Sequence, residues 1–149
     1  MKKHALAALL AAAAASAPLW PTPAAAQALR EPKTMLLDQS SETLIDAASA
    51  KALLKETVPA KVWKLYPEGR WTFLSQVAGG VTEDGICAVT ARVVLLPRTG
   101  TIRAVIWRPL QVATAFDAKA GATAEQCRAL ARDKLKEATT AVVSALIKG

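Results

Sequence analysis

Two kinds of hydrophobic pattern follow each other along this chain. An Ala-, Leu- and Lys-rich run starts after Ser40 or Ser41, either of which can cap a helix, and stops before Val58-Pro59. It predicts a helix that ends near Glu56. From Lys61 onward the pattern changes to short alternating stretches rich in Val, Ile, Trp and Thr, with turn residues between them. Such stretches predict strands.

Four strands are predicted in this second part, near residues 61–66, 71–78, 86–96 and 101–115. The connections between them are short, Gly79-Gly80 being interpreted as a turn, and this favours an antiparallel meander. A four-residue loop over 97–100 would pair Leu95 with Ile102. One face of the 86–96 strand is then apolar, with Cys87, Val89, Ala91, Val93 and Leu95.

The C-terminal segment has the clearest helical signature. Thr123 and Gln126 have the spacing of a capping box, and the helix should continue to about Ile147. Apolar residues recur at helical spacing along it: Cys127, Ala131, Leu135, Ala138, Val142 and Leu146. This stripe needs an apolar surface to cover, and the strand face that carries Cys87 is the best candidate.

These elements predict an α+β fold. We expect an antiparallel three- to four-stranded meander with an N-terminal helix and a C-terminal helix packed on the sheet. By length, residues 40–149 form a single domain. Residues 27–39 contain Pro32 and show little periodicity, so they are interpreted as a lead-in.

Residues 1–26 have the layout of a secretory signal peptide. Lys2 and Lys3 precede an apolar run over residues 5–17, and small residues lead to an expected cleavage site after Ala26. The apolar run is too short to span a bilayer, and no later stretch is long and apolar enough to do so. The sequence therefore predicts a periplasmic or secreted product without a transmembrane segment, with an uncleaved anchor as the alternative.

The two cysteines, Cys87 and Cys127, are predicted to form a disulfide, because an exported protein matures in an oxidising compartment. The bond would stabilise the fold by about 4 kcal/mol. It would also dock the C-terminal helix on the apolar strand face. A redox-active pair is the alternative, but the Cys-x-x-Cys spacing is missing.

Composition narrows the classes of function. Cleavage removes His4, the only histidine, so histidine-based catalytic sites and histidine-ligated zinc are excluded from the mature chain. Cleavage also leaves 17 basic against 12 acidic side chains, a balance that favours anionic partners. Nucleic acid is not an expected partner, because export separates the chain from it.

A mixed surface of arginine and tryptophan is the leading candidate site. Its predicted residues are Arg92, Arg103, Trp107, Arg108 and Trp63. Guanidinium groups bind carboxylates and phosphates in a forked geometry, and aromatic rings supply contact area. The alternative interpretation is ordinary sheet alternation, with tryptophans that belong to the core.

Acidic residues are a weaker candidate. Glu83 and Asp84 in one turn, with Asp117 further along, could serve as catalytic or metal-binding carboxylates, but adjacent acids in a turn are usually turn chemistry. The sequence therefore predicts no catalytic residue, no metal site and no cofactor.

The favoured function is a small exported, non-enzymatic binding or accessory protein of the bacterial cell envelope. Its partner would be an envelope protein or an anionic envelope component, bound through the Arg/Trp surface or the loops. Two alternatives remain open. One is an envelope hydrolase that uses carboxylates or a Ser/Lys pair, and the other is a structural subunit that pairs through an edge strand.

Overall fold

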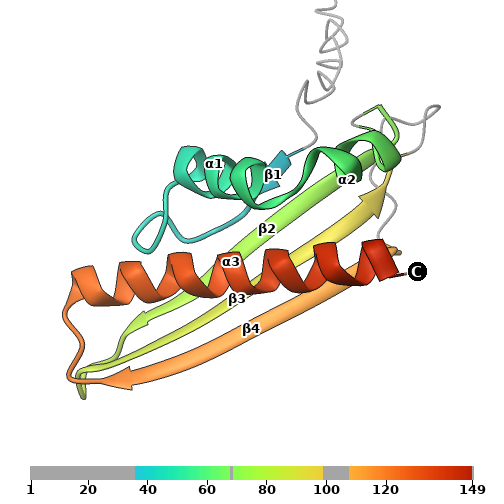
Figure 1. The fold of residues 1–149 in the computed structure, drawn as a ribbon. Helices are drawn as coiled ribbons and strands as arrows, with labels where there is room; N and C mark the ends of the chain where they lie inside the picture. Colours follow the sequence, from blue (N-terminus) through green and yellow to red (C-terminus); the bar gives the residue numbers. More distant parts are fainter. Residues whose placement is uncertain (1–35, 68, 99–107, 149) are drawn as a thin grey trace, which may run out of the picture.

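The computed structural model describes residues 36–67, 69–98 and 108–148. In these residues a four-stranded sheet forms one layer and the helices form the other, all on the same side of the sheet (Figure 1). The elements in chain order are β1 (Leu36–Asp38), α1 (Ala47–Thr57), α2 (Ala60–Leu65), β2 (Trp71–Val81), β3 (Ile86–Pro97), β4 (Gln111–Ala120) and α3 (Ala124–Lys148).

The sheet is mixed, with the strand order β1-β2-β3-β4. β2, β3 and β4 are antiparallel neighbours, whereas β1 is parallel to β2. The α+β class is thus confirmed, and the prediction of a purely antiparallel sheet is wrong. The reason lies in the expected lead-in: Asp38 accepts a 2.6 Å hydrogen bond from the Ser75 hydroxyl, which fixes β1 beside β2.

The core lies between β3 and α3. Alternate residues of β3 from Cys87 to Leu95 are fully buried on the helical face, as the sequence predicts. α3 lies across β3 and β4, and the predicted disulfide joins Cys87 to Cys127 in its first turn. The predicted capping box is also present, because Thr123 and Gln126 exchange side-chain to backbone hydrogen bonds of 3.2 and 2.9 Å.

The first helix begins later than predicted. The N–H of Ser41 donates to the carbonyl of Val77, so Ser41 extends the contact with β2 and does not start a helix. Asp46 caps α1 instead, accepting hydrogen bonds from the hydroxyl and the N–H of Ser49. These bonds hold the pKa of Asp46 below its ordinary value, since they favour the charged carboxylate.

The predicted strand over 61–66 is wrong, because these residues belong to α2. Pro59 occupies the N-cap of this helix, where a missing N–H costs nothing. The helical turn buries Val62 completely and packs Trp63 against the core. A run of six residues is too short for periodicity to separate a strand from a helical turn.

The predicted hairpin after β3 has the wrong partner. Leu95 lies opposite Gln111 and not Ile102, because β4 is the segment 111–120. Ile102 itself lies outside the described residues. Gly79-Gly80 is not a turn either, since both glycines lie within β2 and Gly79 pairs with Val89.

β4 is held by small inward side chains and one ion pair. Ala113 and Ala115 face the core on the side of the sheet that α3 covers. The Asp117 carboxylate lies 3.3 Å from the Lys134 ammonium of α3. Hydrogen bonds to Glu137 and, next, to Asp117 raise the pKa of Lys134. Of the helices described, none has the length and apolar character needed to cross a membrane.

Candidate functional site

One face of the sheet carries no described helix, and we call it the open face. Because side chains alternate along a strand, the register of β2, β3 and β4 places the other half of their residues here. Two neighbouring rows of side chains across the three strands form the candidate site. The first row is Gln76, Arg92 and Thr114, and the second is Ala78, Thr90 and Phe116.

Phe116 is the most prominent feature of the open face. Its side chain is 62 % exposed, the largest value among the exposed large hydrophobic residues of the described chain. Its neighbour on β3 is Thr90, and Ala78 follows in the same row on β2. The neighbours of the ring within its row are therefore short side chains, and Arg92 lies diagonally from it in the next row.

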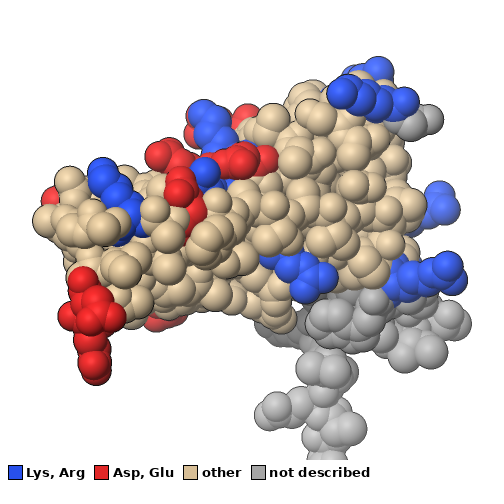
Figure 2. Space-filling view, turned by 90° about the horizontal axis from the view of Figure 1, so that it is seen from below, with Lys and Arg blue, Asp and Glu red and all other residues tan. Residues whose placement is uncertain are grey.

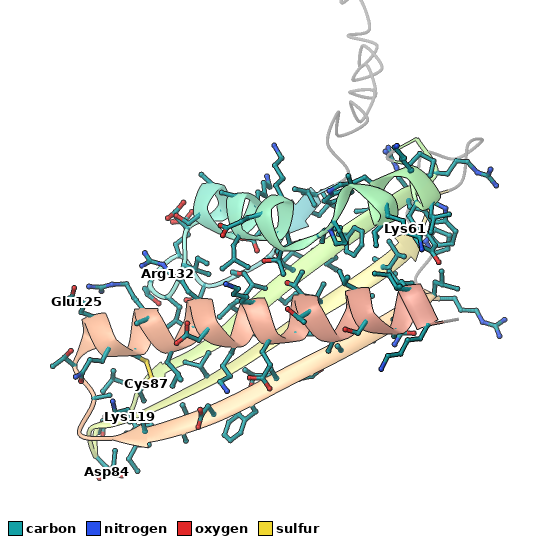
Figure 3. The ribbon with its side chains drawn as sticks, in the orientation of Figure 1. Lys61, Asp84, Cys87, Lys119, Glu125 and Arg132 are labelled. Atoms are coloured by element: carbon teal, nitrogen blue, oxygen red, sulfur yellow. A yellow bond between two sulfur atoms is a disulfide. The ribbon has the colours of Figure 1, made fainter. Side chains whose placement is uncertain are left out.

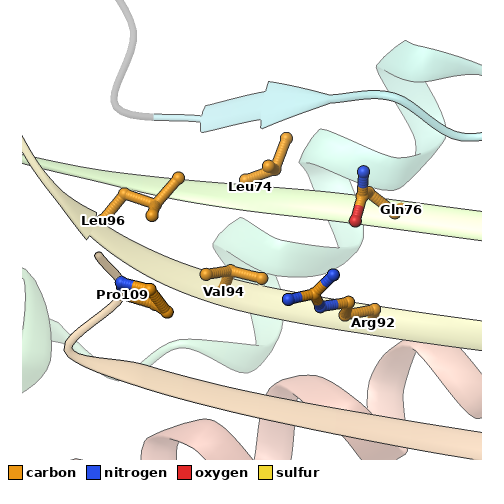
Figure 4. Close-up of a pocket in the computed structure, with 6 residues that line it drawn as sticks. All are labelled: Leu74, Gln76, Arg92, Val94, Leu96 and Pro109. Atoms are coloured by element: carbon orange, nitrogen blue, oxygen red, sulfur yellow. The ribbon is translucent and has the colours of Figure 1, made fainter. Parts of the chain in front are cut away.

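Arg92 lies in the neighbouring row and is exposed. It makes no hydrogen bond or ion pair with any residue that the structure describes. Its side chain borders a small cavity of about 90 Å³, shown in Figure 4, in which Arg92 and Gln76 lie at one end and Leu96 and Pro109 at the other. That volume holds a few water molecules or the end of one side chain.

The floor of the cavity is apolar. Leu74, Val94 and Leu96 form a second buried cluster, against which Leu37 and Val112 pack. Thr72 lies opposite Leu96 in the register, and its hydroxyl is buried without a hydrogen-bond partner in the described chain. An unpaired buried hydroxyl weakens the folded state, because it has lost its bonds to water. The site thus joins one unpaired cation to an apolar surface.

The structure separates the predicted site residues. Arg92 lies on the open face, and exposed Arg108 directly precedes Pro109, which lines the same cavity. Trp63 lies on the helical side of the sheet, where its ring packs edge to face on Phe73 with 5.4 Å between ring centroids. Arg103 and Trp107 lie outside the described residues.

Phe116 and Gln76 were missed in the sequence. The last strand was expected to end at 115, which left Phe116 in a connection. The alternation of Thr114, Phe116 and Ala118 was the available signal, but alanines at the intervening positions made it weak.

The predicted acidic candidates are not gathered into a site. Glu83 and Asp84 are exposed in the turn between β2 and β3, whereas Asp117 is paired with Lys134. Across residues 36–67, 69–98 and 108–148, no three His, Cys, Asp or Glu side chains are placed to hold a metal ion.

Comparison with known proteins places the chain in no family. No protein-family model matches it, and no curated protein matches it either. Among solved structures, one similar chain is described as "a putative lipoprotein from Caulobacter crescentus CB15". The two chains are 10 % identical, the match covers 75 % of this chain and 84 % of the other, and the TM-score is 0.29. At this TM-score the similarity supports no statement about function.

Proposed function

We propose that this protein is an exported, non-enzymatic accessory protein of the cell envelope that binds another envelope protein through the open face of its sheet. Export is supported by the signal-like residues 1–26 and by the Cys87–Cys127 disulfide, a bond typical of oxidising compartments.

One observation carries the proposal. The three helices of the described chain pack on one face of the sheet, while the other face keeps Phe116 62 % exposed in the row beside unpaired Arg92. Aromatic and arginine side chains supply a large share of the binding energy at protein interfaces. The short side chains of Ala78 and Thr90 offer a flat surface next to them, which suits a protein partner better than a small molecule.

The experiment begins with capture from an envelope extract, with the oxidised protein as bait, at low and at high salt. The affinity of the captured partner is then measured for single variants. Phe116→Ala and Arg92→Glu are each expected to weaken binding roughly tenfold or more, as removal of a central interface residue does. Salt should weaken binding of the original protein, since one anchor is a charge.

Two variants serve as matched controls. Arg132→Glu makes the same charge change on α3, and Leu65→Ala removes another half-exposed apolar side chain at the end of α2. Both should bind the partner like the original protein. If Phe116→Ala and Arg92→Glu also bind with unchanged affinity, the open face is not the interface and the proposal fails.

A structural subunit is the second candidate. β4 ends the strand order, so no described strand pairs with its outer edge over Gln111–Ala120. Such an edge can pair with another chain. An apparent mass that rises with protein concentration would favour this role, whereas the leading proposal needs only a monomer.

A further inference from the structure

Three segments place an exposed aliphatic residue at the same end of the molecule. α2 ends at Leu65, the chain enters β4 through Leu110, and α3 closes with Ile147 before Lys148. Leu65, Leu110 and Ile147 are 55 %, 50 % and 46 % exposed. Figure 1 shows the end of α2, the start of β4 and the C-terminus at one end of the sheet.

Exposed cations accompany these aliphatic residues. Lys64 and Lys148 lie in the last turns of α2 and α3, Arg108 lies shortly before β4, and Arg70 directly precedes β2; all four are exposed. We call these four cations and the three aliphatic residues the basic end. In Figure 2 several lysines and arginines lie at this end, where no acidic side chain is visible, while the middle and the far end carry side chains of both signs.

The two ends of the domain differ in their mixture of charges. Figure 3 places Lys61 at the basic end, whereas the opposite end near Cys87 carries Asp84 and Glu125 together with Lys119. Cations in the last turn of a helix stabilise the helix dipole, which accounts for Lys64 in α2 and Lys148 in α3. The helix dipole does not account for the half-exposed aliphatic side chains beside these lysines, because contact of an aliphatic side chain with water is unfavourable.

We infer that the basic end docks on an anionic phospholipid surface. Cations are attracted to anionic headgroups, and the neighbouring aliphatic side chains can enter the interfacial region, the two contributions that hold peripheral proteins on bilayers.

This inference goes beyond the proposed function. Its residues adjoin the open-face cavity only at Pro109, which lies between Arg108 and Leu110. Phe116 and Arg92 lie on the open face of the sheet, along the side of the domain, and the basic end is at its tip. In a domain docked through the tip, the strands would run away from the membrane surface. The open face would then remain accessible to a protein partner.

Vesicle flotation tests the inference directly. The protein is purified as the cell exports it, with its N-terminus established by intact mass. It is mixed with vesicles of phosphatidylcholine containing phosphatidylglycerol, or of phosphatidylcholine alone. Binding to the anionic vesicles should be roughly tenfold or more the stronger, and should weaken as salt rises.

Variants locate the contact. Arg108→Glu combined with Lys148→Glu should weaken binding to anionic vesicles by at least about fivefold for each cation lost. Leu65→Ser combined with Ile147→Ser should weaken it further, since it removes buried aliphatic area. The matched control is Lys119→Glu combined with Arg128→Glu, which makes the same change in net charge at the opposite end. Thermal unfolding of each variant verifies that it folds.

Two results overturn the inference: equal binding to anionic and neutral vesicles, or equal losses in the control pair and in the pair at the basic end. Phe116→Ala should leave vesicle binding unchanged. Failure of this inference is thereby distinguished from failure of the proposed partner interface.

Discussion

Replacing Cys87 and Cys127 together by alanine is expected to lower the free energy of unfolding by about 4 kcal/mol. The disulfide joins residues 40 positions apart and attaches the first turn of α3 to β3. Without it the unfolded chain gains the freedom of a long open loop, and this favours unfolding. Urea denaturation followed by circular dichroism measures the change.

Reducing the disulfide of the unmodified protein measures the effect of the cross-link apart from the effect of lost packing. Both cysteines are buried, so the alanine variant also loses apolar contact, whereas the reduced protein keeps its sulfur atoms. The reduced protein should therefore lie between the oxidised protein and the variant, and closer to the variant. Reductant should leave the variant itself unchanged. A loss under about 1 kcal/mol on reduction would contradict the entropic role assigned to this bond.

The parts of the fold that could be predicted are those where several signals agree. For α3, a capping box at Thr123, an apolar stripe at helical spacing and Cys127 at the start of that stripe all favoured one helix on one strand face. The alternation of β3 gave the same face for Cys87. Each signal constrains the others, because a disulfide can form only if the helix and the strand already meet.

The errors in β1, α2 and β4 have a common cause: each element depends on tertiary contacts that a local sequence pattern does not show. β1 exists because the Asp38 carboxylate accepts from Ser75, a residue distant in sequence. α2 exists because a helical turn, and not a strand, buries Val62 against the core. β4 is rich in alanine, a residue with low strand propensity, so its strand conformation depends on its pairing with β3 and on its contacts with α3.

The candidate site could be predicted only in part. Arg92 was placed correctly opposite the apolar face, because the register within one strand follows from alternation alone. The sequence could not show that Trp63 lies on the other side of the sheet from Arg92, because the position of Trp63 depends on whether residues 60–65 are helical or extended. Phe116 depends on where β4 ends, and strand boundaries are the least certain feature of a sequence pattern.

Gly79→Ala is expected to lower the free energy of unfolding by about 3 kcal/mol or more. Gly79 lies inside β2 with a φ of 125°, in the region that favours glycine. A Cβ atom at this position would overlap the carbonyl oxygen of Ala88 and lie 3.0 Å from its carbonyl carbon. Because Ala88 is backbone-paired in β3, neither strand can move aside without breaking ladder hydrogen bonds. Urea denaturation gives the value.

Gly80→Ala is the matched control for this effect. Gly80 also has a positive φ, 150°, but a Cβ atom there would meet nothing within 4 Å. Alanine at position 80 should therefore cost only the conformational strain, about 1 to 2 kcal/mol, and the difference between the two variants measures the close approach of β2 and β3. Equal losses in the two variants would mean that the strands separate at this point with little cost, and the tight pairing of Gly79 with Val89 would be refuted.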